Sequence, residues 1–192
     1  MPLPRRLFAF AAPLALLASS LPAPLSAQEN TTDKYTEDEI LTATKGFFGD
    51  TSRDLATIIE KVFRDQGQPN AYITGEEAAG AIALGVRYGN GWLHRKTAQN
   101  RRLYWQGPSL GFDLGANASK VFTLVYNLGN SGEIFQRYPG VEGTIYVVGG
   151  FGVNYQQRGN VILAPIRTGV GLRAGANVGY LHNTREQETL PF

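Results

Sequence analysis

The sequence predicts a mainly β fold, a small antiparallel β-barrel with two N-terminal α-helices packed against it. Two observations lead to this prediction. About eight short segments of alternating apolar and polar residues follow residue 71, with turn residues between them. A glycine-rich segment, Gly107–Asn117, returns as Gly169–Asn177, and both copies end in G-x-x-x-G-A-N. Glycine at alternate strand positions permits the bends that a small closed barrel needs.

The N-terminus has the three parts of a secretory signal peptide. Arg5 and Arg6 precede the apolar run Leu7–Leu17, and a segment of small residues ends at Ala27. Prolines interrupt the apolar residues before they reach the ~20 that a membrane-spanning helix requires. We therefore expect residues 1–27 to be a signal peptide that is removed on export.

Cleavage would leave residues 28–35 as a flexible leader and residues 36–192 as one domain. The full chain has 18 basic and 16 acidic residues, and loss of the two signal-peptide arginines makes the exported chain neutral, 16 against 16. Residues 28–79 hold 11 acidic and 5 basic residues, whereas residues 80–192 hold 5 acidic and 11 basic ones. The two parts should therefore attract each other.

The absence of cysteine restricts the possible chemistry. It excludes thiol catalysis and thiolate metal sites, and a chain of ~165 residues can build its core without disulfides. His94 and His182 are the only histidines, and the sequence places no third ligand or base beside them. We expect no catalytic residue, no metal and no cofactor.

The segment 36–67 is predicted to be helical. Thr36 and Glu39 have the spacing of a capping box, which begins the first helix, and Gly49 ends it. Thr51 gives a second cap signal. The following apolar stripe has helical spacing and stops at Gly67: Leu55, Ile58, Ile59, Val62 and Phe63. We expect this stripe to pack against the barrel.

The barrel itself is predicted over residues 71–181. Asn90-Gly91 is a strong signal for a two-residue hairpin turn, and residues 94–102 are expected to form a long basic turn. Residues 144–155 are expected to form one long strand, broken at Gly149-Gly150. The second glycine-rich copy is expected to be a strand over residues 169–181, and residues 182–192 are predicted to be a polar tail.

Three segments resemble the EipA family, periplasmic proteins of alphaproteobacteria that are tied to envelope integrity. They are residues 85–91 (GVRYGNG), 104–117 (YWQGPSLGFDLGAN) and 149–155 (GGFGVNY). The resemblance covers nearly the whole chain after the signal peptide. It implies a small periplasmic β-barrel with a role in envelope stress resistance, and no established catalytic residues. The order of the glycine-rich strands and the Asn-Gly turn, without a match of fixed residues, is also similar to SYLF domains, a lipid-binding class.

The basic turn and the aromatic residues around it are the candidate binding site. Guanidinium groups suit phosphate, so this turn is a candidate for holding an anionic lipid or lipopolysaccharide head group; the alternative is a solvated loop beside half-buried aromatic residues. The candidate residues are Trp92, His94, Arg95, Lys96, Arg101, Arg102, Tyr104 and Trp105. Asp113 and Arg173 stand at matching places in the two glycine-rich copies and are predicted to form a structural ion pair inside the barrel.

The predicted function is that of a non-enzymatic periplasmic protein that supports envelope integrity by binding an envelope lipid or glycolipid, with no nucleic-acid partner. Two alternatives stay open. An integral outer-membrane barrel is favoured by the terminal Phe192, but Glu188 and Pro191 do not fit a last transmembrane strand. A periplasmic hydrolase would need a positioned nucleophile and base, which the sequence does not specify.

Overall fold

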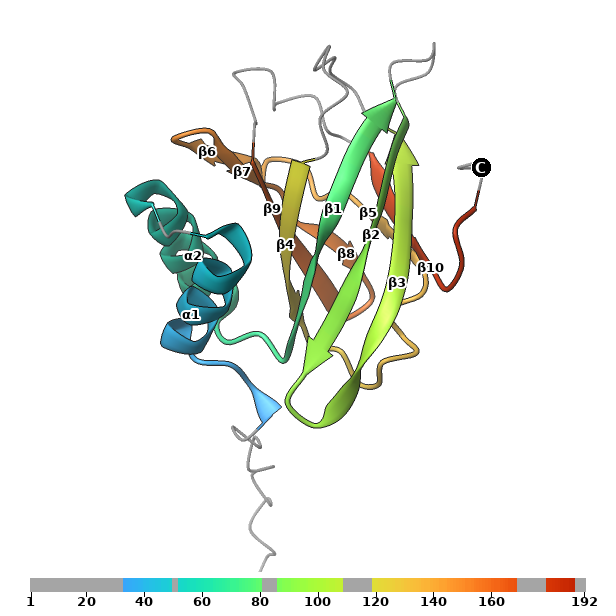
Figure 1. Cartoon of the computed structure of the whole chain (residues 1–192), viewed down its shortest axis with the longest axis horizontal. Coiled ribbons are helices and arrows are strands. Elements are labelled where there is room, and N and C mark those ends of the chain that lie inside the picture. Colours follow the sequence, from blue (N-terminus) through green and yellow to red (C-terminus); the bar gives the residue numbers. More distant parts are fainter. Residues whose placement is uncertain (1–32, 50–51, 81–85, 109–118, 169–178, 189–192) are drawn as a thin grey trace, which may run out of the picture.

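The computed structural model describes residues 33–49, 52–80, 86–108, 119–168 and 179–188. In these ranges two helices precede ten strands (Figure 1). The helices are α1 (Glu37–Phe48) and α2 (Arg53–Gln66). The strands are β1 (Ala71–Gly80), β2 (Val86–Arg95), β3 (Ala98–Pro108), β4 (Ser119–Tyr126), β5 (Arg137–Pro139), β6 (Tyr146–Val148), β7 (Phe151–Val153), β8 (Gln156–Arg158), β9 (Val161–Thr168) and β10 (Tyr180–Thr184).

The described strands form one antiparallel sheet that curls into a barrel. Its order is β5-β10-β3-β2-β1-β4-β9-β7-β6, and β8 also pairs with β9. A bridge between Gly140, directly after β5, and Gln156 of β8 joins the two sides of the sheet. The backbone N–H of Val141 donates to the carbonyl of Tyr155 at 2.8 Å in the same place. The prediction of a mainly β barrel with two N-terminal helices is confirmed.

Alternate side chains of each barrel strand point inward. Over much of the barrel these inward residues, together with two residues of the β4–β5 connection, form one buried apolar cluster. Its members are Ala71, Ile73, Leu93, Leu103, Trp105, Val121, Val125, Leu128, Ile134, Tyr138, Val161, Leu163 and Leu181. Leu93 and Leu103 of this cluster lie near the β2–β3 turn and are buried. Apolar side chains therefore fill the barrel at the end near that turn.

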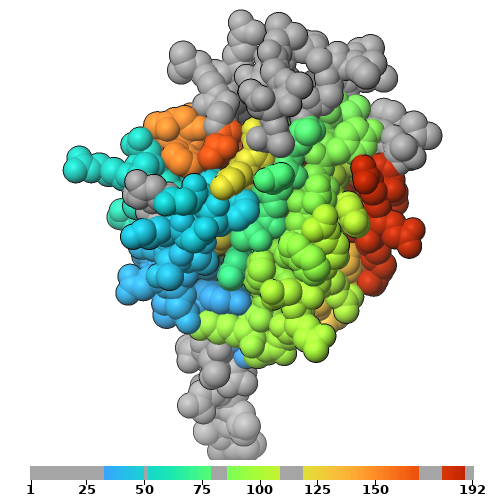
Figure 2. Space-filling view, in the orientation of Figure 1, coloured from blue at the N-terminus to red at the C-terminus, as the bar shows by residue number. Residues whose placement is uncertain are grey.

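Both helices lie on one side of the barrel, beside β4, β9 and the β6–β7 hairpin (Figure 1). The predicted stripe of α2 faces this side, and Leu55, Ile58, Ile59 and Val62 have no exposed surface. These four residues pack in a cluster with the outward side chains of β4 and β9, namely Phe122, Leu124, Tyr126, Ala164 and Ile166. The predicted packing of the stripe on the barrel is confirmed. The outward face of β2 and β3 is not covered by the helices (Figure 2).

The helix ends follow the capping rules with one correction. Thr36 and Glu39 form the predicted capping box, and α1 ends at Gly49 with φ 93°. The N-cap of α2 is Ser52, whose Oγ accepts from the Leu55 N–H at 3.2 Å, and not Thr51. Glu39 also pairs with Lys96 at 2.7 Å, which joins the acidic helical segment to the basic hairpin. Among the described residues, no helix is long and apolar enough to cross a membrane.

The first predicted hairpin lies elsewhere. The turn between β2 and β3 is at Lys96-Thr97, and Asn90-Gly91 lies inside β2. The predicted long basic turn is therefore only two residues, and most of residues 94–102 belong to strands. The glycine at position 91 is explained by the close approach of β1, because a Cβ there would overlap the carbonyl oxygen of Thr74.

Two later segments also differ from prediction. Residues 144–155 contain a hairpin of β6 and β7, which turns at Gly149 and Gly150 with φ 56° and 82°. The predicted polar tail begins too early, because β10 continues to Thr184 and pairs with β3 and β5. Asp113 and Arg173, with most of the two glycine-rich copies, lie outside the described residues.

Candidate functional site

Three of the predicted site residues belong to one surface on the outward face of β2 and β3. The register pairs Trp92 with Arg102, Asn90 with Tyr104, and Tyr88 with Gln106. Since side chains alternate along a strand, all six lie on the side that faces away from the barrel interior. We call this surface the outer strip, and its members are Tyr88, Asn90, Trp92, Arg102, Tyr104 and Gln106.

Arg102 is held between the aromatic rings of the outer strip. Its Nη2 donates to Asn90 Oδ1 at 2.6 Å. The guanidinium carbon lies 5.4 Å from the ring centroid of Trp92 and 5.5 Å from that of Tyr104, which are cation–π distances. Trp92 is 44% exposed, an unusual value for a tryptophan in a folded domain. The strip therefore presents exposed aromatic surface next to an ordered positive charge.

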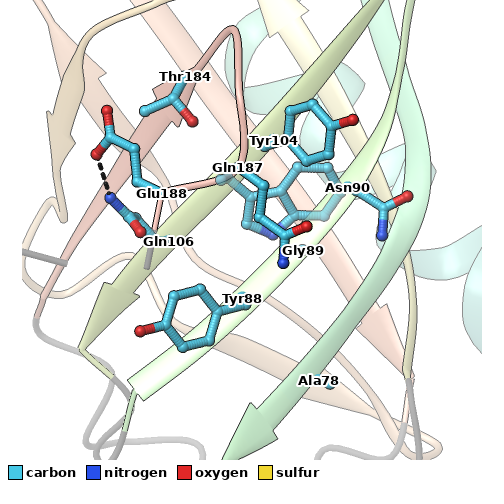
Figure 3. A pocket seen from close by; sticks show the side chains of 10 residues that line it. Ala78, Tyr88, Gly89, Asn90, Tyr104, Gln106, Thr184, Gln187 and Glu188 are labelled. Carbon is cyan, nitrogen blue, oxygen red and sulfur yellow. Dashed lines mark hydrogen bonds between the residues drawn. The ribbon is translucent and has the colours of Figure 1, made fainter. Parts of the chain in front are cut away.

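A pocket of about 190 Å³ opens at the other end of the outer strip (Figure 3). Its walls are the rings of Tyr88 and Tyr104 and the C-terminal segment with Gln187 and Glu188. Glu188 is held there, because the Gln106 side-chain amide donates to its carboxylate at 2.7 Å. Aromatic rings surrounded by a few placed amide and carboxylate groups are typical of small-molecule sites.

The other basic residues of the predicted site contact the protein itself. Arg95 donates to the carbonyls of Leu128 and Gly129 at 3.3 Å. Lys96 pairs with Glu39, as described above, and Arg101 lies 6.0 Å from the ring centroid of Phe135. The hairpin is thus tied to its surroundings and does not gather its cations at one point.

His94 lies on the same outward face, two residues beyond Trp92 along β2, but its ring is directed toward β1. Its ring stacks on Tyr72 of β1 with centroids 4.6 Å apart, and its Nε2 is 2.9 Å from Thr74 Oγ1. Burial lowers the pKa of His94, and a hydrogen bond with Asn100 acts in the opposite direction. His182 lies on β10, with β3 between it and β2, so the two histidines do not share a site. The described part of the chain has no group of three metal-ligating side chains.

Trp105, the last predicted residue, points into the barrel. Its side chain is 4% exposed and its indole N–H donates to Glu77 at 3.0 Å. The indole lies across Gly89, where any Cβ would overlap it. Trp105 and Gly89 are also among the residues that line the pocket.

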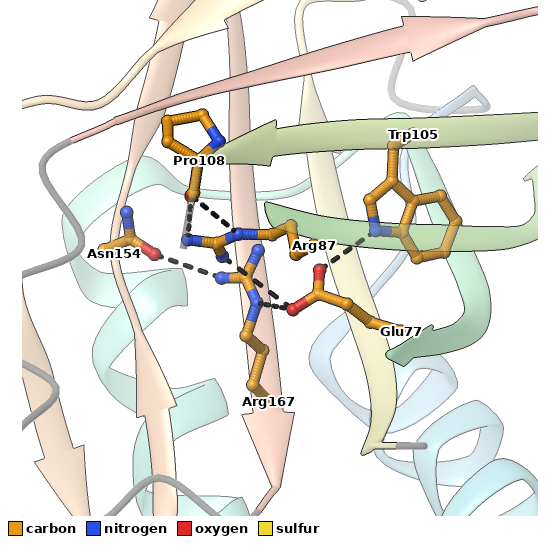
Figure 4. A network of polar contacts seen from close by, with 6 residues as sticks. All are labelled: Glu77, Arg87, Trp105, Pro108, Asn154 and Arg167. Carbon is orange, nitrogen blue, oxygen red and sulfur yellow. Dashed lines mark hydrogen bonds and ion pairs between the residues drawn. The ribbon is translucent and has the colours of Figure 1, made fainter. Parts of the chain in front are cut away.

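Glu77 belongs to a group of buried charges that sequence patterns did not identify (Figure 4). Arg167 Nε donates to Glu77 at 3.1 Å, and Arg87 Nη1 lies 3.8 Å from the same carboxylate oxygen. Arg87 also donates to the carbonyl of Pro108 at 2.9 and 3.1 Å. Arg167 Nη1 donates to Asn154 at 3.2 Å. We call Glu77, Arg87, Asn154 and Arg167 the inner cluster.

The electrostatics of the inner cluster keep Glu77 ionised. Burial alone would raise the pKa of Glu77, but the charges of Arg167 and Arg87 and the hydrogen bonds from Trp105 and Arg167 lower it. Burial, followed by the charge of Arg167, lowers the pKa of Arg87 to about 10, so this guanidinium stays charged at neutral pH. The cluster is therefore a group of three buried charges.

The parity of Arg167 along its strand is a signal for the inner cluster that the sequence contained. Arg167 shares its parity along β9 with the inward residues Val161 and Leu163. A charged residue at an inward position of an otherwise apolar strand indicates a buried partner. Its partner Glu77 is 90 residues away in the chain, so no local pattern connects the two.

Comparison with known proteins gives a consistent result. A beta-barrel-like, uncharacterised protein from Brucella abortus, solved as a crystal structure, is 45% identical to this chain, with a TM-score of 0.77. The match covers 83% of this chain and 99% of that one. No curated protein matches the chain at a significant level. The EipA family, described as envelope integrity protein A, matches residues 33–192. The chain therefore belongs to the EipA family.

Proposed function

We propose that this protein supports envelope integrity as a non-enzymatic periplasmic protein that binds the saccharide head group of an envelope glycolipid on its outer strip. The family description supports the envelope role. The signal-peptide pattern of residues 1–27 supports export to the periplasm.

The observation that carries the proposal is the chemistry of the outer strip. The apolar C–H faces of sugar rings pack on aromatic rings, and Trp92, Tyr88 and Tyr104 offer such rings at or near the surface. Sugar hydroxyl groups need hydrogen-bond donors and acceptors, which the side chains of Asn90, Gln187 and Glu188 supply along the same surface. The guanidinium of Arg102 adds a contact for a phosphate substituent.

A glycolipid fits the outside of the barrel better than the inside. The inward apolar residues form a cluster of buried side chains in mutual contact, which leaves no place for an acyl chain among them.

The outward face also bears on the alternative of a membrane barrel. The outward residues Glu76, Asn90 and Arg102 lie on neighbouring strands. Such side chains are unfavourable on the lipid-facing side of a membrane barrel, so we favour a periplasmic protein over an integral one.

Binding to vesicles tests this proposal. The purified protein is sedimented with phosphatidylcholine vesicles, with and without lipopolysaccharide, at low and moderate salt. We expect binding only when lipopolysaccharide is present. Tyr104→Ala should weaken it by about tenfold, which corresponds to about 1.4 kcal/mol, because it removes a central ring. Arg102→Gln should reduce its dependence on salt, because a screened charge contact is lost.

Matched variants control for general effects. Tyr180→Ala removes a half-buried tyrosine outside the pocket, and Arg64→Gln removes an exposed charge from α2. Both should bind as the wild type does. Equal binding by Tyr104→Ala and Tyr180→Ala, with both proteins folded, would contradict a role for the outer strip.

A further inference from the structure

The inner cluster carries more positive than negative charge. Two guanidinium groups, of Arg87 and Arg167, face a single carboxylate, that of Glu77. Besides Glu77, Arg167 has one further hydrogen-bond partner among the described residues, Asn154, which is neutral (Figure 4). The group therefore has a surplus of one positive charge among the described residues. A buried surplus of positive charge is costly, so an anion bound beside Arg167 would stabilise the group.

Arg167 keeps a hydrogen-bond donor for such an anion. Its Nε donates to Glu77 and its Nη1 donates to Asn154. Its Nη2 is buried and has no hydrogen-bond partner among the described residues. The residue is only 7% exposed, so bulk water does not readily satisfy this group. An unpaired N–H of a buried guanidinium is an open position for an acceptor oxygen.

The inner cluster lies near an end of the barrel. Glu77 precedes the end of β1 by three residues, Arg87 is the second residue of β2, and Arg167 is the second-last residue of β9. The register places these positions at the same end, opposite the β2–β3 turn, because Gly75 pairs with Val121 and Val121 pairs with Arg167. Each charged side chain retains a small exposed fraction of 5–10%.

We propose that the inner cluster binds a small oxyanion, with Arg167 Nη2 as donor to one of its oxygens. Phosphate and carboxylate groups share the chemistry that fits, a negative charge spread over oxygens that accept from planar guanidinium groups. The lowered pKa of Arg87, caused by burial and then by Arg167, is consistent with a place that favours an anion. The site is inside the barrel and is separate from the outer strip.

Thermal unfolding of the purified protein tests the proposal. Sodium phosphate is added while sodium chloride keeps the ionic strength constant. A ligand that binds only the folded state raises the melting temperature, so we expect a saturable rise with phosphate. Acetate in place of phosphate shows whether a carboxylate is accepted, and glycerol 3-phosphate shows whether the phosphate is free or part of a larger head group. A melting temperature that stays constant in all three anions would overturn the proposal.

Variants of the inner cluster show whether phosphate binds there. Arg167→Lys keeps one positive charge near Glu77 but removes the planar donor, and should weaken phosphate binding at least tenfold. Glu77→Gln removes the competing carboxylate and should strengthen binding. Arg158→Gln, an exposed change on the β8–β9 hairpin, should bind phosphate as the wild type does.

A second measurement covers the case in which Arg167→Lys does not fold. Broadening of the phosphate ³¹P resonance by the wild type, and more strongly by Glu77→Gln, would support the site. Equal phosphate binding by folded Arg167→Lys and the wild type would overturn it.

Discussion

Trp105 shows how one large side chain determines which residues its neighbours can be. Its indole lies inside the barrel, across Gly89 and against Gly75, and ends in a hydrogen bond to Glu77. A strand glycine normally weakens a sheet, so these two glycines are explained by the space that the indole needs.

Gly89→Ala should therefore destabilise the fold by about 1–3 kcal/mol, the usual cost of overpacking a core. The free energy of unfolding in urea measures this. Gly46→Ala is the control, because it lies in α1 with no atom near its Cβ position. That change should stabilise the protein by about 0.5–1 kcal/mol. A Gly89→Ala protein as stable as the wild type would show that the indole moves aside without cost.

The lowered pKa of His94 leads us to expect that the stability of the protein depends on pH. Burial lowers the pKa of the folded histidine, with an opposing contribution from Asn100, whereas the unfolded chain takes up the proton near pH 6.5. As the pH falls through about 6.5, the unfolded state binds more protons and stability decreases, until the lowered folded pKa is reached. His94→Gln should flatten urea-unfolding stability between about pH 7 and 5.5. The same slope in variant and wild type would contradict this explanation.

Among the elements, α2 was the most predictable from sequence. Its apolar stripe has helical period, so local pattern and tertiary packing agree, and the stripe is buried as expected. Ile59→Ala should cost about 2–5 kcal/mol in unfolding free energy, because it leaves a cavity between α2 and the barrel.

Glu60→Ala, on the exposed face of the same helix, provides the comparison for Ile59→Ala. Glu60 pairs with Arg64 at the surface at 3.0 Å, and such pairs contribute little, so the change should stay within about 0.5 kcal/mol. A similarly small effect of Ile59→Ala would mean that the helix contributes little to the fold.

The ends of the barrel strands were harder to predict from sequence than those of α2, and each wrong prediction has a physical reason. Asn90-Gly91 has the composition of a turn, but its glycine is required by the close approach of β1. The end of β10 looks polar, yet Asn183 and Thr184 are buried within the sheet. Of the predicted site, Trp92, Arg102 and Tyr104 share one surface, whereas the inner cluster depends on contacts across 90 residues that no local pattern contains.

For the molecule as a whole, every proposed role depends on the predicted export to the periplasm. The signal-peptide pattern predicts a mature protein that begins near Gln28. Mass spectrometry of the protein recovered from the periplasm should find this N-terminus. Recovery of a chain that still carries residues 1–27 would contradict the predicted cleavage.

The central claim is that the protein supports the envelope through its outer strip. Its most direct test is survival under detergent stress of cells that lack the protein and express wild type, Tyr104→Ala or Tyr180→Ala at equal periplasmic levels. We expect that wild type and Tyr180→Ala restore survival and that Tyr104→Ala does not. Full restoration by a folded, exported Tyr104→Ala protein would contradict it.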